Sequence, residues 1–276
     1  MAHALIFDSG VGGLSVAAEI AKALPALRRS YAADDAFRPY GDKSEAALRA
    51  RLPELLATLE NMLAPDVIVI ACNTASTTAL PQIRAAVSVP VVGVVPAIKP
   101  AAQITRTGTI AVLGTPGTVR QKYVGGLIKD FAPDKQVILH GSVGLVALAE
   151  AKLAGQAVDM QILADEIAPL FSGPSGGEID AVVLACTHFP LLRDELMTAS
   201  QSFTQQNINW IDSGEAIARR VKSVLAENTP KVNAPTSHPE EQRDTAFLIG
   251  PKTKSDISPS RKSGFARFGF ETLVAI

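Results

Sequence analysis

Residues 66–76 read Asp-Val-Ile-Val-Ile-Ala-Cys-Asn-Thr-Ala-Ser, and this stretch decides the fold. Its apolar, mostly β-branched run predicts a strand buried on both faces, as in a parallel sheet covered by helices. Polar residues begin where the strand ends, so Cys72 and Asn73 are expected at its carboxyl end. Thr74 and Ser76 are candidates to cap the following helix, whose N-terminus would favour the thiolate form of Cys72. The fold class predicted from this stretch is α/β.

The same design recurs at residues 180–188, which read Asp-Ala-Val-Val-Leu-Ala-Cys-Thr-His. Again an aspartate opens an apolar run that ends in alanine, cysteine and polar residues. The two cysteines of the chain, Cys72 and Cys186, therefore stand at equivalent points of two similar predicted strands. Two cysteines placed at random would rarely do so, and we take their pairing as the main clue to function.

A second pattern is also repeated, a strand that ends in a glycine turn. Residues 4–7 form an apolar run followed by Asp-Ser-Gly-Val-Gly-Gly (residues 8–13), and residues 109–113 form another followed by Gly-Thr-Pro-Gly-Thr (residues 114–118). Glycine turns let backbone N–H groups approach an anion, although the carboxylate of Asp8 would repel a phosphate. Each half thus has a strand with a glycine turn and then a strand with a cysteine, which predicts an internal duplication.

We expect two parallel-sheet α/β domains. The first comprises residues 1–97 plus 211–276 and carries Cys72, and the second comprises residues 98–210 and carries Cys186. Residues 31–45 are predicted to be loop, with a helix opening at Ser44, and residues 96–107 are predicted to be a crossing point or linker. Beyond residue 226 we expect loops, one short strand at residues 246–249, and a mobile segment around residues 252–263.

The composition is that of an ordinary globular protein. The 276 residues are 47% hydrophobic and 19% charged, and the net charge of -1 gives no electrostatic case for binding nucleic acid or a membrane surface. No apolar run approaches the roughly 18 residues of a membrane-spanning helix, and the amino terminus shows no signal peptide. Two cysteines far apart in sequence suit a reducing compartment, so a cytoplasmic location is expected.

Two thiols at one site allow several chemistries. They could form a dithiol switch, hold a metal with His188, act as paired acid and base, or include a nucleophilic Cys186 assisted by His188; two buried structural cysteines are the plain alternative. A zinc site would want more ligands, and a Cys–His hydrolase leaves Cys72 unexplained. The many hydroxyl and amide groups at the strand ends suit a small zwitterion with carboxylates. Paired acid and base on opposite faces would invert a carbon centre.

Four motifs carry a family resemblance: Asp8-Ser9-Gly10-x-Gly12-Gly13, Pro39-Tyr40-Gly41, Ala71-Cys72-Asn73-Thr74-Ala75 and Cys186-Thr187-His188-Phe189-Pro190. As a set, over about residues 4–224, they resemble the glutamate racemase family of the aspartate/glutamate racemase superfamily. The resemblance implies two α/β domains related by pseudo-twofold symmetry, with the active site at their interface. It implies racemisation of L-glutamate to D-glutamate for peptidoglycan, with no pyridoxal phosphate, metal or other cofactor.

The resemblance also implies roles for individual residues. Cys72 would remove the α-proton of D-glutamate and Cys186 that of L-glutamate, with Asp8 supporting the first thiol, His188 the second, and Glu150 supporting His188. Ala185 and Phe189 depart mildly from the family pattern, where glycine and tyrosine are common. The residues expected to hold the substrate are Ser9, Pro39, Tyr40, Gly41, Asn73, Thr74, Thr115, Thr118 and Thr187.

Two alternatives remain open at this point. The chain could be a related racemase that acts on another acid such as aspartate, or it could be a non-catalytic binding protein, since some glutamate racemases are reported to bind DNA gyrase. A homodimer is expected, and neither nucleic acid nor membrane is an expected partner. Intact Cys72 and Cys186 favour catalysis.

Overall fold

The computed structural model describes residues 1–228, 244–250 and 257–276. It divides into two compact units, one made of Met1–Val94 with Gly214–Ile276 and the other of Val95–Ser213. The sequence-based boundaries had placed residues 95–97 and 211–213 in the first domain, whereas the structure assigns them to the second unit.

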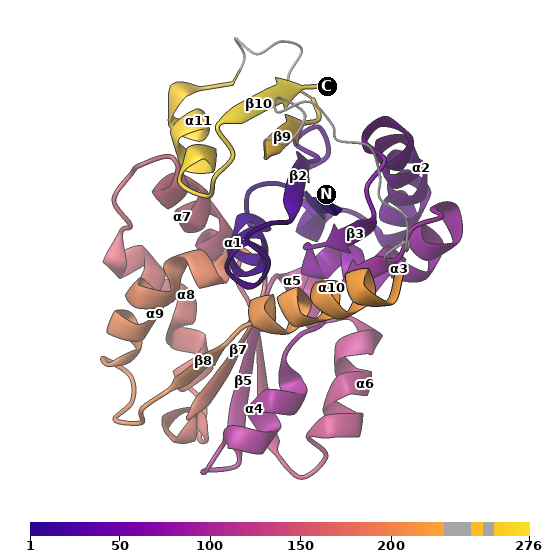
Figure 1. Cartoon of the computed structure of the whole chain (residues 1–276). Coiled ribbons are helices and arrows are strands. Elements are labelled where there is room, and N and C mark those ends of the chain that lie inside the picture. Colours follow the sequence, from indigo (N-terminus) through magenta and orange to yellow (C-terminus); the bar gives the residue numbers. More distant parts are fainter. Residues whose placement is uncertain (229–243, 251–256) are drawn as a thin grey trace. The chain divides into compact units, whose positions relative to one another are not determined.

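The first unit is built on a six-stranded sheet in the order β10-β9-β2-β1-β3-β4, and every paired neighbour is parallel. The last elements of the chain, yellow in Figure 1, thus extend the sheet that the first elements begin. The strands are β1 (His3–Asp8), β2 (Arg28–Ala33), β3 (Val67–Ile70), β4 (Val91–Gly93), β9 (Thr245–Leu248) and β10 (Thr272–Ala275). The helices are α1 (Leu14–Ala23), η1 (Tyr40–Asp42), α2 (Glu45–Leu63), α3 (Asn73–Ala86), α10 (Gly214–Asn228) and α11 (Pro259–Ala266).

The second unit has a four-stranded parallel sheet in the order β6-β5-β7-β8. Its strands are β5 (Thr109–Gly114), β6 (Gln136–Gly141), β7 (Ala181–Ala185) and β8 (Asn209–Ile211). Its helices are α4 (Ile98–Ile104), α5 (Pro116–Val119), α6 (Lys122–Phe131), α7 (Gly144–Leu153), α8 (Met160–Phe171), η2 (Gly176–Glu178), η3 (Phe189–Leu192) and α9 (Arg193–Ser200).

The two sheets share one topology, which confirms the predicted duplicated α/β fold. The order β2-β1-β3-β4 in the first unit corresponds to β6-β5-β7-β8 in the second. In each unit the first and third strands are neighbours. The second strand lies on the outer side of the first, and the fourth lies on the outer side of the third. The carboxyl ends at such a switch point are where open α/β sheets bind ligands. Cys186 directly follows the third strand of its unit, and Cys72 follows the third strand of its unit after one residue, Ala71.

The aspartates that open the two cysteine motifs have matching structural roles. Asp66 Oδ2 accepts a 2.7 Å hydrogen bond from the N–H of His3, where β1 begins. Asp180 Oδ1 accepts from the hydroxyl of Thr105 and its Oδ2 from the N–H of Arg106, just before β5. Burial alone would raise the pKa of Asp180, but these hydrogen bonds outweigh it and lower the pKa. Each aspartate thus ties the start of the third strand to the start of the first.

The core of each unit lies between its sheet and its helices. All four residues of β3 are buried, as the continuous apolar run predicted. Helix α2 packs on that sheet through leucines spaced three or four residues apart, each contributing about 2 kcal/mol by removal of apolar surface from water. Its buried leucines are Leu48, Leu52, Leu56 and Leu59.

Some of the predictions about local structure were wrong. The stretch predicted as loop contains the last three residues of β2, and the predicted linker at residues 96–107 contains α4. Of the segment predicted to be mobile, residues 251–256 lie outside the described part of the chain, whereas Pro259–Ala266 form α11. Residue 72 itself is the N-cap of α3, without a side-chain cap; the hydroxyl of Ser76 instead donates to the carbonyl of Ile70.

Candidate active site

Cys72 lies beside the glycine turn of the first unit. Phe7 and Ile70 are paired between β1 and β3, so the chain continues with Asp8 level with Ala71 and Ser9 level with Cys72. Cys72 is the N-cap of the 14-residue helix α3, where the helix dipole favours a thiolate. Its Sγ donates to the hydroxyl of Ser9 over 3.8 Å. The thiol is therefore held at a helix N-terminus beside a hydroxyl with which it can exchange a proton.

Asp8 is fully buried, and one of its two carboxylate oxygens has hydrogen-bond partners. Its Oδ2 accepts hydrogen bonds from the N–H groups of Gly10 and Gly13, at 3.3 and 3.0 Å. Within the described residues, neither its Oδ1 nor the side-chain oxygen of Asn73 has a hydrogen-bond partner. A buried polar atom left unpaired costs about 1–3 kcal/mol, so such atoms are characteristic of sites that receive a ligand or a mobile proton.

The Tyr40 side chain is fixed by a buried carboxylate. Its hydroxyl donates to Asp34 Oδ2 at 2.7 Å, and the guanidinium of Arg51 donates to both Asp34 oxygens, each at 2.7 Å. Burial and then the charge of Asp34 raise the pKa of Tyr40 far above its usual range, so the phenol stays protonated. Pro39 is exposed and Gly41 partly buried. The proton of the phenol hydroxyl is therefore already committed to Asp34.

Cys186 faces a histidine and a carboxylate. Its Sγ lies 3.8 Å from Nδ1 of His188, and Nε2 of the same ring lies 3.2 Å from Oε1 of Glu150 on α7. The thiol and the ring are both buried. A thiol, an imidazole and a carboxylate in series form the arrangement that activates a cysteine and orients its base.

The threonines of the second unit lie at the same sheet edge as Cys186. Gly114 pairs with Ala185, which places the turn after β5 beside the end of β7. Thr115 caps α5 by accepting from the N–H of Thr118 at 3.2 Å, and the two hydroxyl oxygens are 3.0 Å apart. Thr187 is buried next to the thiol. Three hydroxyls thus gather near Cys186.

The predicted site residues therefore form one cluster in each unit. The first contains Asp8, Ser9, Cys72, Asn73 and Thr74, with Pro39, Tyr40 and Gly41 on the turn after β2; the second contains Thr115, Thr118, Glu150, Cys186, Thr187 and His188. Sequence reasoning missed the groups that support the first cluster. Asp34 and Arg51, which hold Tyr40, and Tyr31, which contacts the glycine turn, had been given no role. The signal available was an aspartate six residues before the tyrosine, inside a stretch taken for loop.

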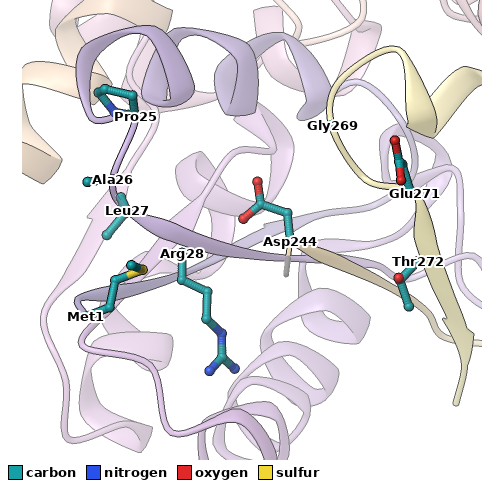
Figure 2. Close-up of a pocket in the computed structure, with 9 residues that line it drawn as sticks. All are labelled: Met1, Pro25, Ala26, Leu27, Arg28, Asp244, Gly269, Glu271 and Thr272. Carbon is teal, nitrogen blue, oxygen red and sulfur yellow. The ribbon is translucent and has the colours of Figure 1, made fainter. Parts of the chain in front are cut away.

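A pocket of about 470 Å³ lies elsewhere in the first unit (Figure 2). Arg28, Asp244 and Thr272, which line it, stand where β2, β9 and β10 begin, so it lies at the amino edge of the sheet. No predicted site residue lines it. Among the described residues, no group of three or more His, Cys, Asp or Glu side chains could hold a metal ion. No described helix is long and apolar enough to cross a membrane.

Comparison with known proteins places the chain in a family. The family model for Asp/Glu/Hydantoin racemase matches residues 11–221, so the chain belongs to this racemase family and is an isomerase by class. A glutamate racemase of Sphingopyxis alaskensis is 53% identical over 217 residues, which cover 79% of this chain and 80% of the relative. A glutamate racemase of Shewanella sp. (strain MR-7) is 44% identical over 272 residues, which cover 99% of this chain and 96% of the relative.

A solved structure agrees with this placement. The crystal structure of Escherichia coli glutamate racemase in complex with L-glutamate and the activator UDP-MurNAc-ala matches with a TM-score of 0.87 and 39% identity, and the match covers 100% of this chain and 98% of that one. Within the family, the chain groups with the glutamate racemases.

Proposed function

We propose that this chain interconverts L- and D-glutamate with two cysteines, one of which removes the α-proton while the other delivers its own proton to the opposite face, and so supplies D-glutamate for peptidoglycan. The observation that carries the proposal is the equivalence of the thiols. Cys72 and Cys186 lie just beyond the third strand of two units with the same topology, and each lies beside its own proton-handling groups. The L-glutamate bound by the E. coli relative supports glutamate as the substrate.

In the proposed mechanism one thiol acts on each face of the α-carbon of glutamate. Cys186 as thiolate takes the α-proton of L-glutamate and becomes a thiol, while the Cys72 thiol delivers its own proton to the opposite face and becomes a thiolate. The reverse sequence converts D-glutamate. Protons and charge balance over the cycle, and the only change between its ends is which sulfur carries the proton.

The α-proton of an amino acid is weakly acidic, so the site must stabilise carbanion-like charge electrostatically. In the proposal this falls to donors preset around the α-carboxylate: the hydroxyls of Ser9 and Thr187, the amide of Asn73, and the backbone N–H groups of the Tyr40 turn. Different neighbours keep the thiols in opposite protonation states. Asp8 supports Cys72, and the His188–Glu150 pair supports Cys186. The scheme requires no cofactor.

The test is racemisation of L-glutamate in deuterated water, followed by circular dichroism and mass spectrometry. Since a thiol holds a single proton that exchanges with solvent, early D-glutamate should carry deuterium at the α-carbon while the remaining L-glutamate stays mostly unlabelled. Cys72→Ala and Cys186→Ala should each reduce racemisation by several orders of magnitude, because acid and base act as a unit. Substantial protium in early product would show that one base serves both faces and would contradict the two-cysteine scheme.

Three associated proposals need separate measurements. A cytoplasmic location would keep both thiols reduced, in line with the lack of a disulfide among the described residues, and fractionation would test it. A homodimer is tested by analytical ultracentrifugation with and without glutamate. An interaction with DNA gyrase would be an additional function, and purified gyrase would test it in a pull-down.

A further inference from the structure

The hydroxyl of Tyr31 contacts the glycine turn at two points. Tyr31 lies in β2 and is fully buried, and its hydroxyl donates to the carbonyl of Gly10 at 2.9 Å. The same oxygen lies 2.9 Å from the position that a Cβ on Gly13 would occupy. Gly10 and Gly13 are the two residues whose N–H groups bind Asp8 Oδ2. Tyr31 therefore meets both residues that orient the Asp8 carboxylate.

The Tyr31 ring is itself held by the C-terminal part of the chain. Phe265 of α11 packs edge-on against it with ring centroids 5.5 Å apart, and Phe270 packs at 5.6 Å. The guanidinium of Arg29 lies 5.1 Å from the centroid of the Phe270 ring. Aromatic pairs of this kind stabilise the packing beyond burial alone. The Tyr31 side chain is thus fixed by its aromatic neighbours, and it reaches from the middle of the sheet to the turn at its carboxyl edge.

We propose that Tyr31 is a positioning residue for Asp8. Its hydroxyl fixes the Gly10 carbonyl, and the fixed turn presents two N–H groups to Asp8 Oδ2. The unpaired Oδ1 of Asp8 is thereby held in one orientation. The inference rests on the proposed function for one step, in which Asp8 supports proton transfer at Cys72. The hydrogen bond from Tyr31 to the glycine turn does not depend on that step.

The first experiment measures the turn directly, without substrate. Tyr31→Phe removes the hydroxyl and keeps the ring packed against Phe265 and Phe270. Tyr123→Phe, at an exposed position on α6, is the matched control. Loss of one hydrogen bond should speed amide hydrogen exchange of residues 9–14 by about 3- to 10-fold in Tyr31→Phe and leave it unchanged in Tyr123→Phe. Unchanged exchange in Tyr31→Phe would overturn the proposal whatever the activity of the variant.

The second experiment asks whether the effect passes through Asp8. In Tyr31→Phe, kcat for D-glutamate should fall about tenfold with KM nearly unchanged and with a larger α-deuterium isotope effect. In an Asp8→Ala background there is no carboxylate to position, so adding Tyr31→Phe should change kcat little. A full tenfold loss in that background would make Tyr31 a structural residue and overturn the proposal. Failure of the proposed function would appear differently, as an inactive wild-type protein, and the exchange experiment would still decide the hold of Tyr31 on the turn.

Discussion

Glu150 Oε1 lies 3.2 Å from Nε2 of His188, and this contact decides whether the ring nitrogen that faces Cys186 carries a proton. An ionised carboxylate accepts only, so it favours the tautomer with the proton on Nε2. The lone pair of Nδ1 then points to the sulfur, 3.8 Å away, and can take the thiol proton. In the proposed mechanism Glu150 would thus control a proton transfer without touching the sulfur.

Glu150→Gln should impair this unit of the site selectively. The glutamine amide can donate to Nε2, which would move the ring proton to Nδ1 and remove the acceptor for the thiol. We expect kcat for L-glutamate to fall by about 100-fold, in the range of general acid–base contributions, with protein stability little changed. Glu195→Gln, which alters a carboxylate paired with Lys152 in the same unit, is the control and should lose less than twofold. Equal losses in both variants would contradict the role of Glu150.

Gly13 should tolerate no side chain. A Cβ there would lie 2.9 Å from Asp8 Cβ, 2.9 Å from the Tyr31 hydroxyl and 3.0 Å from Ala71 Cβ, so the turn would have to shift. We expect Gly13→Ala to lower the free energy of unfolding by about 1–3 kcal/mol and to abolish most activity. Gly125→Ala on α6 has nothing within 4 Å of the added carbon and should stabilise by about 0.5–1 kcal/mol. Urea unfolding of both variants makes the comparison, and similar stabilities would refute the steric argument.

Because of His3, the free energy of unfolding should fall as the pH is lowered. Burial, followed by the charge of Arg28, lowers the pKa of His3 from 6.5 to about 4. Between those values the unfolded chain binds a proton that the folded chain does not, so the stabilising effect is complete above pH 6.5 and is lost as pH falls toward 4. The slope attributable to His3 is at most about 1.4 kcal/mol per pH unit. His3→Gln should flatten the pH dependence of the free energy of unfolding in that window, and an unchanged slope would count against it.

Asp244 should be a major contributor to the stability of the first unit. Its carboxylate accepts from the backbone and guanidinium of the buried Arg29. Removing it leaves a buried charge unpaired, so Asp244→Ala should cost about 3 kcal/mol or more. Glu215→Ala breaks an exposed pair with Arg219 and should cost less than about 1 kcal/mol. Chemical denaturation distinguishes them, and equal costs would be incompatible with this account.

Substrate length should matter. In the proposed complex, hydroxyls such as those of Thr115 and Thr118 meet two carboxylates at a fixed separation, and aspartate is one methylene shorter. Buried donors would remain unpaired, which costs far more than the lost methylene itself. We expect kcat/KM for aspartate to be at least about 100-fold below that for glutamate. Comparable kcat/KM values for aspartate and glutamate would contradict the assignment to glutamate and favour another member of the racemase family.

Much of this architecture could be predicted from the sequence because its central strands are continuous apolar runs with cysteines at their ends. Strand β2 could not, because it begins Arg-Arg-Ser. Those polar residues become strand only through distant partners: Arg29 bonds to Asp244, and Ser30 lies 2.8 Å from His3 Nε2. The support of Tyr40 by Asp34 was missed for a different reason, since both residues lie in the stretch that was predicted to be loop. Helix capping by Thr74 or Ser76 was mispredicted since Cys72 itself takes the N-cap position.

The first unit is discontinuous in sequence, and this has a consequence during synthesis. Arg29 and Asp244, which join β2 to the start of β9, are 215 positions apart, whereas the second unit is one uninterrupted segment. The second unit can therefore complete its sheet while the ribosome is still adding residues that the first unit lacks. Until β9 arrives, β2 presents an open edge of the kind that pairs with other chains. A nascent chain truncated after residue 228 would keep both cysteines and yet leave that edge uncovered.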